Sequence, residues 1–220
     1  MSINEPLYRA LSKDFGYLTF STPLEVQEEI NNLLEEIIDP QTNGKGPIWS
    51  YAHIENQYIK PIPKIFKQFI LDLSSNFNYQ DNLLNNGYLE DYYRTFKKKI
   101  PDVVVDENIW FNFQKKNEYI APHNHDGILH YIIFHKIPYT LEDEQLNSPL
   151  LSESQYSNSN GNFYFIQPGS RNVHFQCLDI DKKWENIIIL FPSNLTHMTL
   201  PFYSSDEYKI TVNGSLHFKI

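Results

Sequence analysis

The sequence predicts a mainly β protein with N-terminal helices, arranged as a double-sheet jelly roll or a barrel. Helical periodicity is confined to the first third of the 220 residues. From about Tyr88 the chain changes to short apolar or alternating runs, rich in β-branched and aromatic residues and separated by turn residues. Runs with this spacing are typical of jelly rolls and barrels. Hydrophobic residues make up 41% of the chain, which is enough for a buried core.

Two helices are expected in the N-terminal part. The first lies within residues 21–40, where Thr22 is placed to cap it and Pro23 takes the first helical position. The second lies within residues 61–77, where apolar side chains recur on one face. Residues 1–87 are therefore predicted to be a helical and mixed lead-in. It would pack on a β core of residues 88–220 and form one compact domain with it.

Eight candidate strands make up the predicted core. They are Gly87–Phe96, Asn108–Gln114, Ile128–Ile137, Gly161–Ile166, Val173–Ile180, Asn186–Pro192, His197–Phe202 and Tyr208–Phe218. The stretch 141–161 is polar and rich in Ser and Asn, so it is predicted to be a long surface loop. In a compact domain a loop of this length is functional or mobile.

Charge and cysteine content limit the partners and the compartment. There are 18 basic and 27 acidic residues, so the net charge of −9 disfavours binding to nucleic acid and to anionic membranes. Cys177 is the one cysteine, which rules out an intrachain disulfide and suits a reducing compartment. The first residues lack the apolar core of a signal peptide. A cytoplasmic protein is expected.

His123 and His125 form the first candidate for a metal site. They are two residues apart and would point to the same face of a strand, where it opens into a turn between Pro122 and Gly127. Imidazole is the commonest metal ligand, and two on one face can take adjacent positions in a metal shell. The alternative is a pair of hydrogen-bonded histidines without metal.

His197 is the strongest candidate for the third ligand. It follows the apolar run that ends at Pro192-Ser193 and would begin the next strand, so it too lies at a strand end. Two such ends meet in the mouth of a jelly roll. Asp126 is the reserve ligand, because two histidines and a carboxylate form the facial triad of non-haem iron oxygenases. On a regular strand Asp126 would face away from His125, and it could instead orient an imidazole.

The other histidines are expected to be structural. His130 and His135 are five apart and face opposite sides of one strand, so they cannot both be ligands. His53 and His217 have no partner nearby in the sequence. His174 and the 141–161 stretch remain candidates to touch a substrate.

An ordered set of motifs covers about residues 109–215, roughly half of the chain. Its residues are Trp110 and Asn112, then Pro122, His123 and His125, then Leu190, Phe191, Pro192, Ser193, Leu195 and His197, then Ser205 and Asp206, and finally Lys209, Ile210 and Thr211. Taken together they resemble the 2-oxoglutarate and iron(II)-dependent oxygenases related to prolyl 4-hydroxylases. The resemblance implies a double-stranded β-helix, which is a distorted jelly roll, backed by N-terminal helices.

The resemblance also implies a site and a reaction. His123, His125 and His197 would hold Fe(II). Lys209 and Thr211 share one face of a strand, twelve residues beyond His197, and would bind the far carboxylate of 2-oxoglutarate. Lysine stands at 209 where this family usually has arginine. Asn112 and Tyr131 would line the cofactor pocket. With O2, such an enzyme hydroxylates a substrate, here a peptidyl residue or a small metabolite, and the acidic surface favours a cationic one.

Two rival functions fit the same sequence. A cupin-like metalloenzyme that does not use 2-oxoglutarate would keep the histidines and leave Lys209 without a role. A non-enzymatic jelly-roll module, for binding or for building a particle, would not need a preformed histidine triad.

Overall fold

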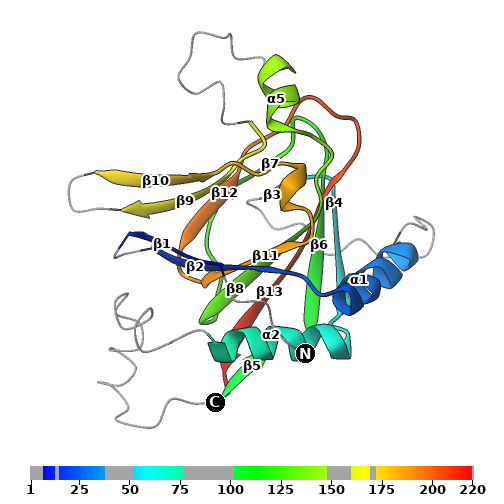
Figure 1. Cartoon of the computed structure of the whole chain (residues 1–220), viewed down its shortest axis with the longest axis vertical. Coiled ribbons are helices and arrows are strands. Elements are labelled where there is room, and N and C mark those ends of the chain that lie inside the picture. Colours follow the sequence, from blue (N-terminus) through cyan, green and yellow to red (C-terminus); the bar gives the residue numbers. More distant parts are fainter. Residues whose placement is uncertain are drawn as a thin grey trace.

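The computed structural model of the chain describes residues 7–12, 15–37, 52–76, 102–147, 160–168 and 172–219. Two antiparallel sheets face each other, and two helices lie on the outer side of the larger sheet (Figure 1). The prediction of a mainly β protein is confirmed.

The larger sheet has eight strands, in the order β1-β2-β11-β8-β13-β6-β4, with β5 paired to β13. Its strands are β1 (Leu7–Ser12), β2 (Phe15–Ser21), β4 (Asn56–Pro61), β5 (Val103–Val105), β6 (Asn108–Gln114), β8 (Leu129–Lys136), β11 (Ile187–Pro192) and β13 (Lys209–Phe218). The smaller sheet has five strands, in the order β10-β9-β12-β7-β3. They are β3 (Ala52–His53), β7 (Tyr119–His123), β9 (Phe163–Pro168), β10 (Val173–Leu178) and β12 (Thr196–Thr199).

The first third contributes strands as well as helices. β2 pairs with β11 and β4 with β6 in the larger sheet, and β3 pairs with β7 in the smaller one. Strands from the lead-in therefore extend both sheets of the core. The predicted strand Gly87–Phe96 and the proposed boundary between residues 87 and 88 lie outside the described residues.

Both N-terminal helices form where the apolar periodicity places them, as α1 (Leu24–Ile37) and α2 (Lys64–Asn76). The Glu29 carboxylate of α1 joins them, because it accepts hydrogen bonds from the first backbone N–H groups of α2, at 2.8 Å from Phe66. The predicted Thr22 cap is wrong. Its Oγ1 has no partner, and its carbonyl oxygen accepts a hydrogen bond of 2.7 Å from the Gln27 side chain instead.

The larger sheet has apolar packing on both faces. On its outer face Tyr131 and Ile133 of β8 pack with the α1 and α2 side chains, among them Phe66. On its inner face Ile132 and Phe134 pack against the smaller sheet. Because alternate residues of a strand point to opposite faces, the register of β8 decides which side chains reach the space between the sheets.

The stretch 141–161 does not begin as a loop. It opens with the helix α5 (Leu141–Asn147), and its residues 148–159 lie outside the described residues. Thr140 caps this helix, with its Oγ1 accepting from the Asp143 N–H at 3.2 Å. Buried Glu144 then accepts hydrogen bonds from the backbone of Tyr203 and Ser204, at 2.9 and 2.8 Å. The helix therefore anchors the segment that precedes β13. A short 3-10 helix (Lys182–Trp184) precedes β11.

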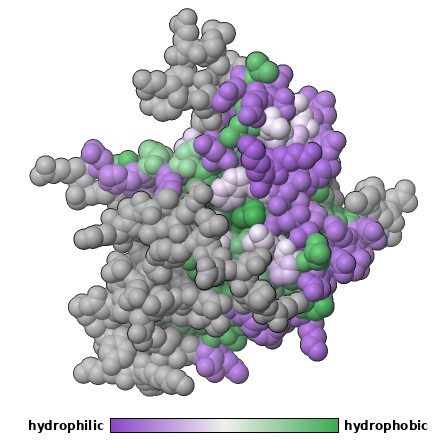
Figure 2. Space-filling model, viewed as in Figure 1, coloured by the Kyte–Doolittle hydropathy of each residue, from purple (hydrophilic) through white to green (hydrophobic). Residues whose placement is uncertain are grey.

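The described surface is mainly hydrophilic in the view of Figure 2, in keeping with the net charge of −9. The projecting hairpin of β9 and β10 is an exception, since it exposes Val173 and Phe175. None of the helices in the described part is long and apolar enough to cross a membrane.

Candidate metal centre

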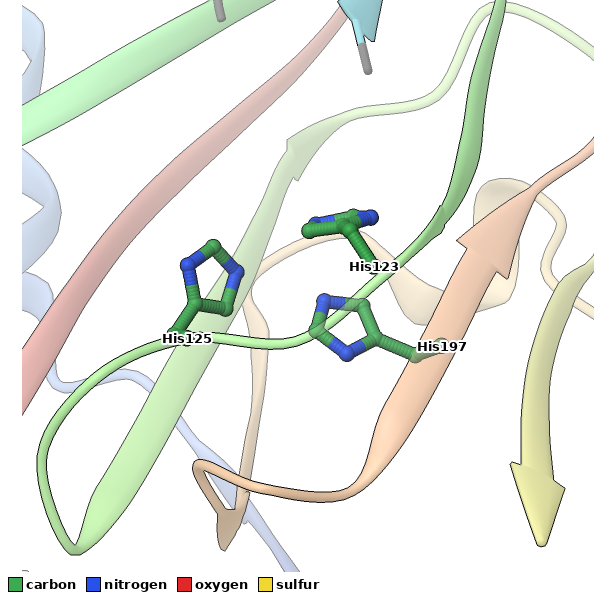
Figure 3. A group of neighbouring side chains, drawn as sticks. All are labelled: His123, His125 and His197. Carbon is green, nitrogen blue, oxygen red and sulfur yellow. The ribbon is translucent and has the colours of Figure 1, made fainter. Parts of the chain in front are cut away.

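Three histidines meet between the ends of two paired strands. β7 and β12 run antiparallel, with His197 directly opposite His123. His125 lies two residues beyond β7, and its backbone N–H donates a 2.9 Å hydrogen bond to the Ser193 carbonyl, which fixes the turn. One nitrogen of each ring lies within 4.8 Å of the others (Figure 3). The structure thus brings together all three predicted ligands.

Backbone carbonyl groups set the tautomer of two of the rings. The Nδ1 of His123 lies 2.7 Å from the Ala121 oxygen, and that of His197 lies 3.0 Å from the Leu195 oxygen. A carbonyl oxygen only accepts, so each Nδ1 carries the hydrogen and donates. Each Nε2 is then left with a lone pair, which is the form that binds a metal.

Burial keeps the three imidazoles neutral. Desolvation lowers the pKa of His123 and, together with the nearby His123 ring, lowers the pKa of His125 to about 3. Desolvation and the nearby rings of His123 and His125 hold the pKa of His197 well below its usual range. Neutral imidazole is the ligand form, so no proton has to be removed at neutral pH before a cation binds.

The ligand set fits a divalent transition metal. Imidazole suits Fe, Zn, Cu and Ni, and three protein ligands leave open positions for other molecules. Asp126 does not take part, because it is exposed and absent from the cluster of described residues. The alternation of faces explains this: His123 and His125 point inward, while Asn124 and Asp126 point out.

A fourth histidine supports the cluster from behind. His130 of β8 is fully buried, and its ring stacks on that of His125 with centroids 3.7 Å apart and planes at 12°. Its Nδ1 lies 3.1 Å from Ser215 Oγ, and its Nε2 has no partner. Trp110 packs against both rings, with centroid distances of 5.6 and 5.4 Å. His130, which the sequence suggests to be structural, thus packs directly against a candidate metal ligand.

The histidines border a small pocket with a cavity volume of about 20 Å³. Asn112 and Thr211, two of the predicted cofactor residues, line it. The other lining residues are Ala52, Gln57, Trp110, Ile120, His123, His125, Ile132, Phe134, Phe163, His197, Thr199 and Asn213. A cavity of this size holds about one water molecule.

Lys209 lies on the inner face of β13, two residues from Thr211 but outside the pocket lining. It is 1% exposed, and its Nζ donates hydrogen bonds of 2.9 Å to Tyr139 Oη and to the Gly161 oxygen. Burial lowers the pKa of Lys209 to about 7. The charge of Glu144 partly offsets this effect, because it raises the same pKa. No salt bridge joins Lys209 to a carboxylate of the described residues, so the site suits an incoming anion.

The structure corrects the placement of Tyr131. Its side chain lies on the outer face of β8, where its ring meets Phe66 at 5.8 Å, and it does not reach the pocket. The pairing of His130 with Ser215 turns even-numbered residues of β8 inward and Tyr131 outward. His174 is exposed on β10 and does not line the pocket.

Comparison with known proteins gives a likeness of fold. No family model and no curated protein matches the sequence. Among solved structures, OsALKBH1 has 9% identity and a TM-score of 0.53, over 94% of this chain and 99% of that one. A Pseudomonas putida prolyl-4-hydroxylase has 10% identity and a TM-score of 0.49, over 94% of each chain. A 2OG-Fe(II) oxygenase family oxidoreductase from Burkholderia pseudomallei has 12% identity and a TM-score of 0.43, over 90% and 85%.

The fold of the chain is similar to that of OsALKBH1. The resemblance in the sequence is therefore confirmed for the fold. At these identities the likeness shows the fold alone.

Three polar residues of the pocket lining were not among those predicted from the sequence. Gln57 comes from the lead-in and reaches the pocket because β4 pairs with β6. Thr199 lies two residues beyond the predicted ligand His197, on the same face of β12. Asn213 lies two residues beyond the predicted cofactor residue Thr211, on the same face of β13. The period of two could have found these two residues. Nothing in the sequence indicates Gln57.

Proposed function

We propose that this chain is an oxygenase that uses Fe(II) and 2-oxoglutarate, with O2, to hydroxylate an organic substrate. The observation that carries the proposal is the cluster of three histidines bordering a pocket whose wall continues along β13 to buried Lys209, which has no carboxylate partner among the described residues. The alternation of β6 to β9 and of β11 to β13 between the two sheets supports a double-stranded β-helix.

His123, His125 and His197 would hold the metal through their neutral rings. When bound there, iron(II) and 2-oxoglutarate would supply the chemistry for oxidation of a substrate C–H bond by dioxygen. The chain holds the ligands in place through the carbonyl groups of Ala121 and Leu195 and through the ring of His130. The three described ligands include no carboxylate, so a bound cation would keep its full charge toward the anionic groups of 2-oxoglutarate.

Lys209 and Thr211 would bind the far carboxylate of 2-oxoglutarate. They lie on one face of β13, and the ammonium of Lys209 lacks a carboxylate partner in the described structure. Asn112 sits directly across from Thr211 and would contact the same molecule. Because the pocket holds about one water, side chains between the histidines and Lys209, foremost Phe134 and Phe163, must move when the dicarboxylate enters.

The rest of the pocket orients the substrate and excludes water. Its apolar wall includes Ile120, Ile132 and Phe163. The substrate is a peptidyl residue, in line with the prolyl hydroxylase resemblance, or a small metabolite.

A metalloenzyme that does not use 2-oxoglutarate is the second candidate. The observation that favours it is the all-histidine shell, which departs from the two-histidine, one-carboxylate triad of non-haem iron oxygenases. In that function Lys209 would stabilise the fold and take no part in the reaction.

The test is succinate release from purified protein with Fe(II), 2-oxoglutarate and ascorbate. We expect turnover in the wild type and its loss in His197→Ala and Lys209→Ala. His135→Ala is the matched control, since His135 is largely buried on the outer face of β8 and does not line the pocket. If both the wild type and Lys209→Ala bind iron but release no succinate, the second candidate function would be favoured. If the chain binds no metal, the non-enzymatic binding module would become the favoured function.

A further inference from the structure

A row of neutral polar side chains crosses the floor of the pocket. Gln57 of β4 pairs with Asn112 of β6, and Asn112 pairs with Thr211 of β13. Paired residues of adjacent strands point to the same face, so the three side chains all face the space between the sheets. All three line the pocket.

One acceptor in this row has no partner. Gln57 Nε2 donates a 2.6 Å hydrogen bond to Asn112 Oδ1, and this bond fixes the orientation of the Gln57 amide. Its Oε1 accepts no hydrogen bond from the described residues, although the side chain is only 1% exposed. A buried acceptor without a partner is unfavourable, so a ligand that brings a donor to this point gains the missing bond.

The described lining of the pocket contains no Asp, Glu, Lys or Arg. Burial of a charged group in such a site would be unfavourable without a partner. At the Gln57 end of this lining, away from the proposed metal ligands and from Lys209, the part of a ligand that lies against the protein is therefore expected to be uncharged.

The row spans the three neighbouring strands β13, β6 and β4. Neighbouring strands lie about 4.8 Å apart, so Gln57 lies roughly 10 Å across the sheet from Thr211. In the proposed function the co-substrate lies along β13, between Lys209 and the metal. Gln57 is on the other side of β6, where the primary substrate would lie once side chains move to enlarge the pocket.

We propose that the pocket takes an uncharged substrate group that donates an N–H or O–H, such as a peptide amide, and that Gln57 Oε1 accepts this hydrogen bond. Gln57 is then a specificity-determining residue and Asn112 its positioning residue. The assignment to the primary substrate rests on the proposed function.

Two amide probes test this on the full-length, metal-free chain by saturation-transfer difference NMR. N-methylacetamide has an N–H donor, and N,N-dimethylacetamide lacks it. We expect the wild type to bind the first about fivefold more tightly. Gln57→Met removes the acceptor at nearly constant volume and should abolish the preference. Gln114→Met is the matched control, because Gln114 is a buried glutamine of β6 that bonds to the Glu118 and Leu200 carbonyl groups outside the pocket.

Equal binding of the two probes to the wild type, or binding of neither, would overturn the proposal. That comparison needs no variant, so it holds even if Gln57→Met fails to fold. If 2-oxoglutarate displaces N-methylacetamide, Gln57 lies in the co-substrate site, and its assignment to the primary substrate is overturned. Because the measurement needs neither iron nor turnover, a chain that releases no succinate but keeps the amide preference would lose only the proposed oxygenase function.

Discussion

The rings of His130 and His125 lie face to face, 3.7 Å between centroids, at the back of the candidate metal centre. His130 holds this position through Ser215 on the neighbouring strand and through Trp110, which contacts both rings. His125 emerges from a turn, whereas His130 belongs to a central strand. The stack therefore lets the rigid sheet set the plane of a ligand that the turn alone would not fix.

His130→Ala should weaken metal binding about 10- to 100-fold, because the ligand loses the group that orients it. Competition titration with Co(II) or Zn(II) against a chelating dye measures this without any assay of activity. His135→Ala is the control for loss of a buried histidine on the same strand, and its metal affinity should stay at the wild-type value. Equal losses in the two variants would mean that the effect is one of general stability.

The metal-free chain should lose stability on mild acidification. His123, His125, His130 and His197 have lowered pKa values, with desolvation as the first cause in each case. Below the unfolded value of about 6.5, the unfolded chain takes up protons that the folded chain does not, so the free energy of unfolding falls with pH. The fall should be about 1 kcal/mol per histidine between pH 7.5 and 5.5.

Urea denaturation at pH 7.5, 6.5 and 5.5 measures that fall. His130→Phe keeps an aromatic ring and removes one titrating group, so its slope should be smaller by about one proton. A wild-type free energy of unfolding that stays constant over this range would contradict neutral, buried imidazoles.

Lys209→Met should raise stability and abolish binding of 2-oxoglutarate. The folded pKa of Lys209 is lowered to about 7, so at pH 7 and below the fold holds a charge with no carboxylate partner in the described structure. Replacement of a buried charge by an apolar side chain of similar size stabilises by about 1–3 kcal/mol. Between pH 7 and 10 the unfolded chain binds the extra proton, so wild-type stability should rise with pH, and the variant should lack this rise.

Chemical denaturation at pH 7 and 9 measures the change in stability, and calorimetric titration measures the binding of 2-oxoglutarate. Lys60→Met is a suitable comparison, because it removes a lysine that is paired with Glu36 at 3.0 Å but keeps Lys209, so this variant should retain the wild-type rise. A Lys209→Met variant that is less stable at pH 7 would indicate that the ammonium is a structural group that favours the fold as it stands.

Short-range patterns were enough for much of the site. The spacing of His123 and His125 predicts one shared face, and the place of His197 after the Pro192-Ser193 turn predicts a second strand end. Both predictions depend only on the period of a strand. The helix α5 could also have been predicted, since Thr140 and Asp143 form a capping pattern directly before Leu141–Asn147.

Long-range pairing decides what the sequence alone cannot. Tyr131 and His130 are neighbours, and only one of them can face the pocket. The pairing of His130 with Ser215, across 85 residues, settles the choice. Gln57 reaches the pocket in the same way, through a pair with Asn112 that spans 55 residues. No local pattern specifies such a register.

Tyr131→Phe tests this register directly. The Tyr131 hydroxyl is buried on the outer face of β8 without a hydrogen-bond partner, and burial raises its pKa above the usual range. Removal of an unpaired buried hydroxyl should leave the free energy of unfolding unchanged or raise it by up to about 1 kcal/mol. Binding of metal and of 2-oxoglutarate should stay at wild-type values, because the side chain packs against Phe66 and not in the pocket. Thermal denaturation and the same calorimetric titration measure both effects. Weaker binding of 2-oxoglutarate at unchanged stability would show that Tyr131 faces inward and that the register of β8 is shifted by one residue.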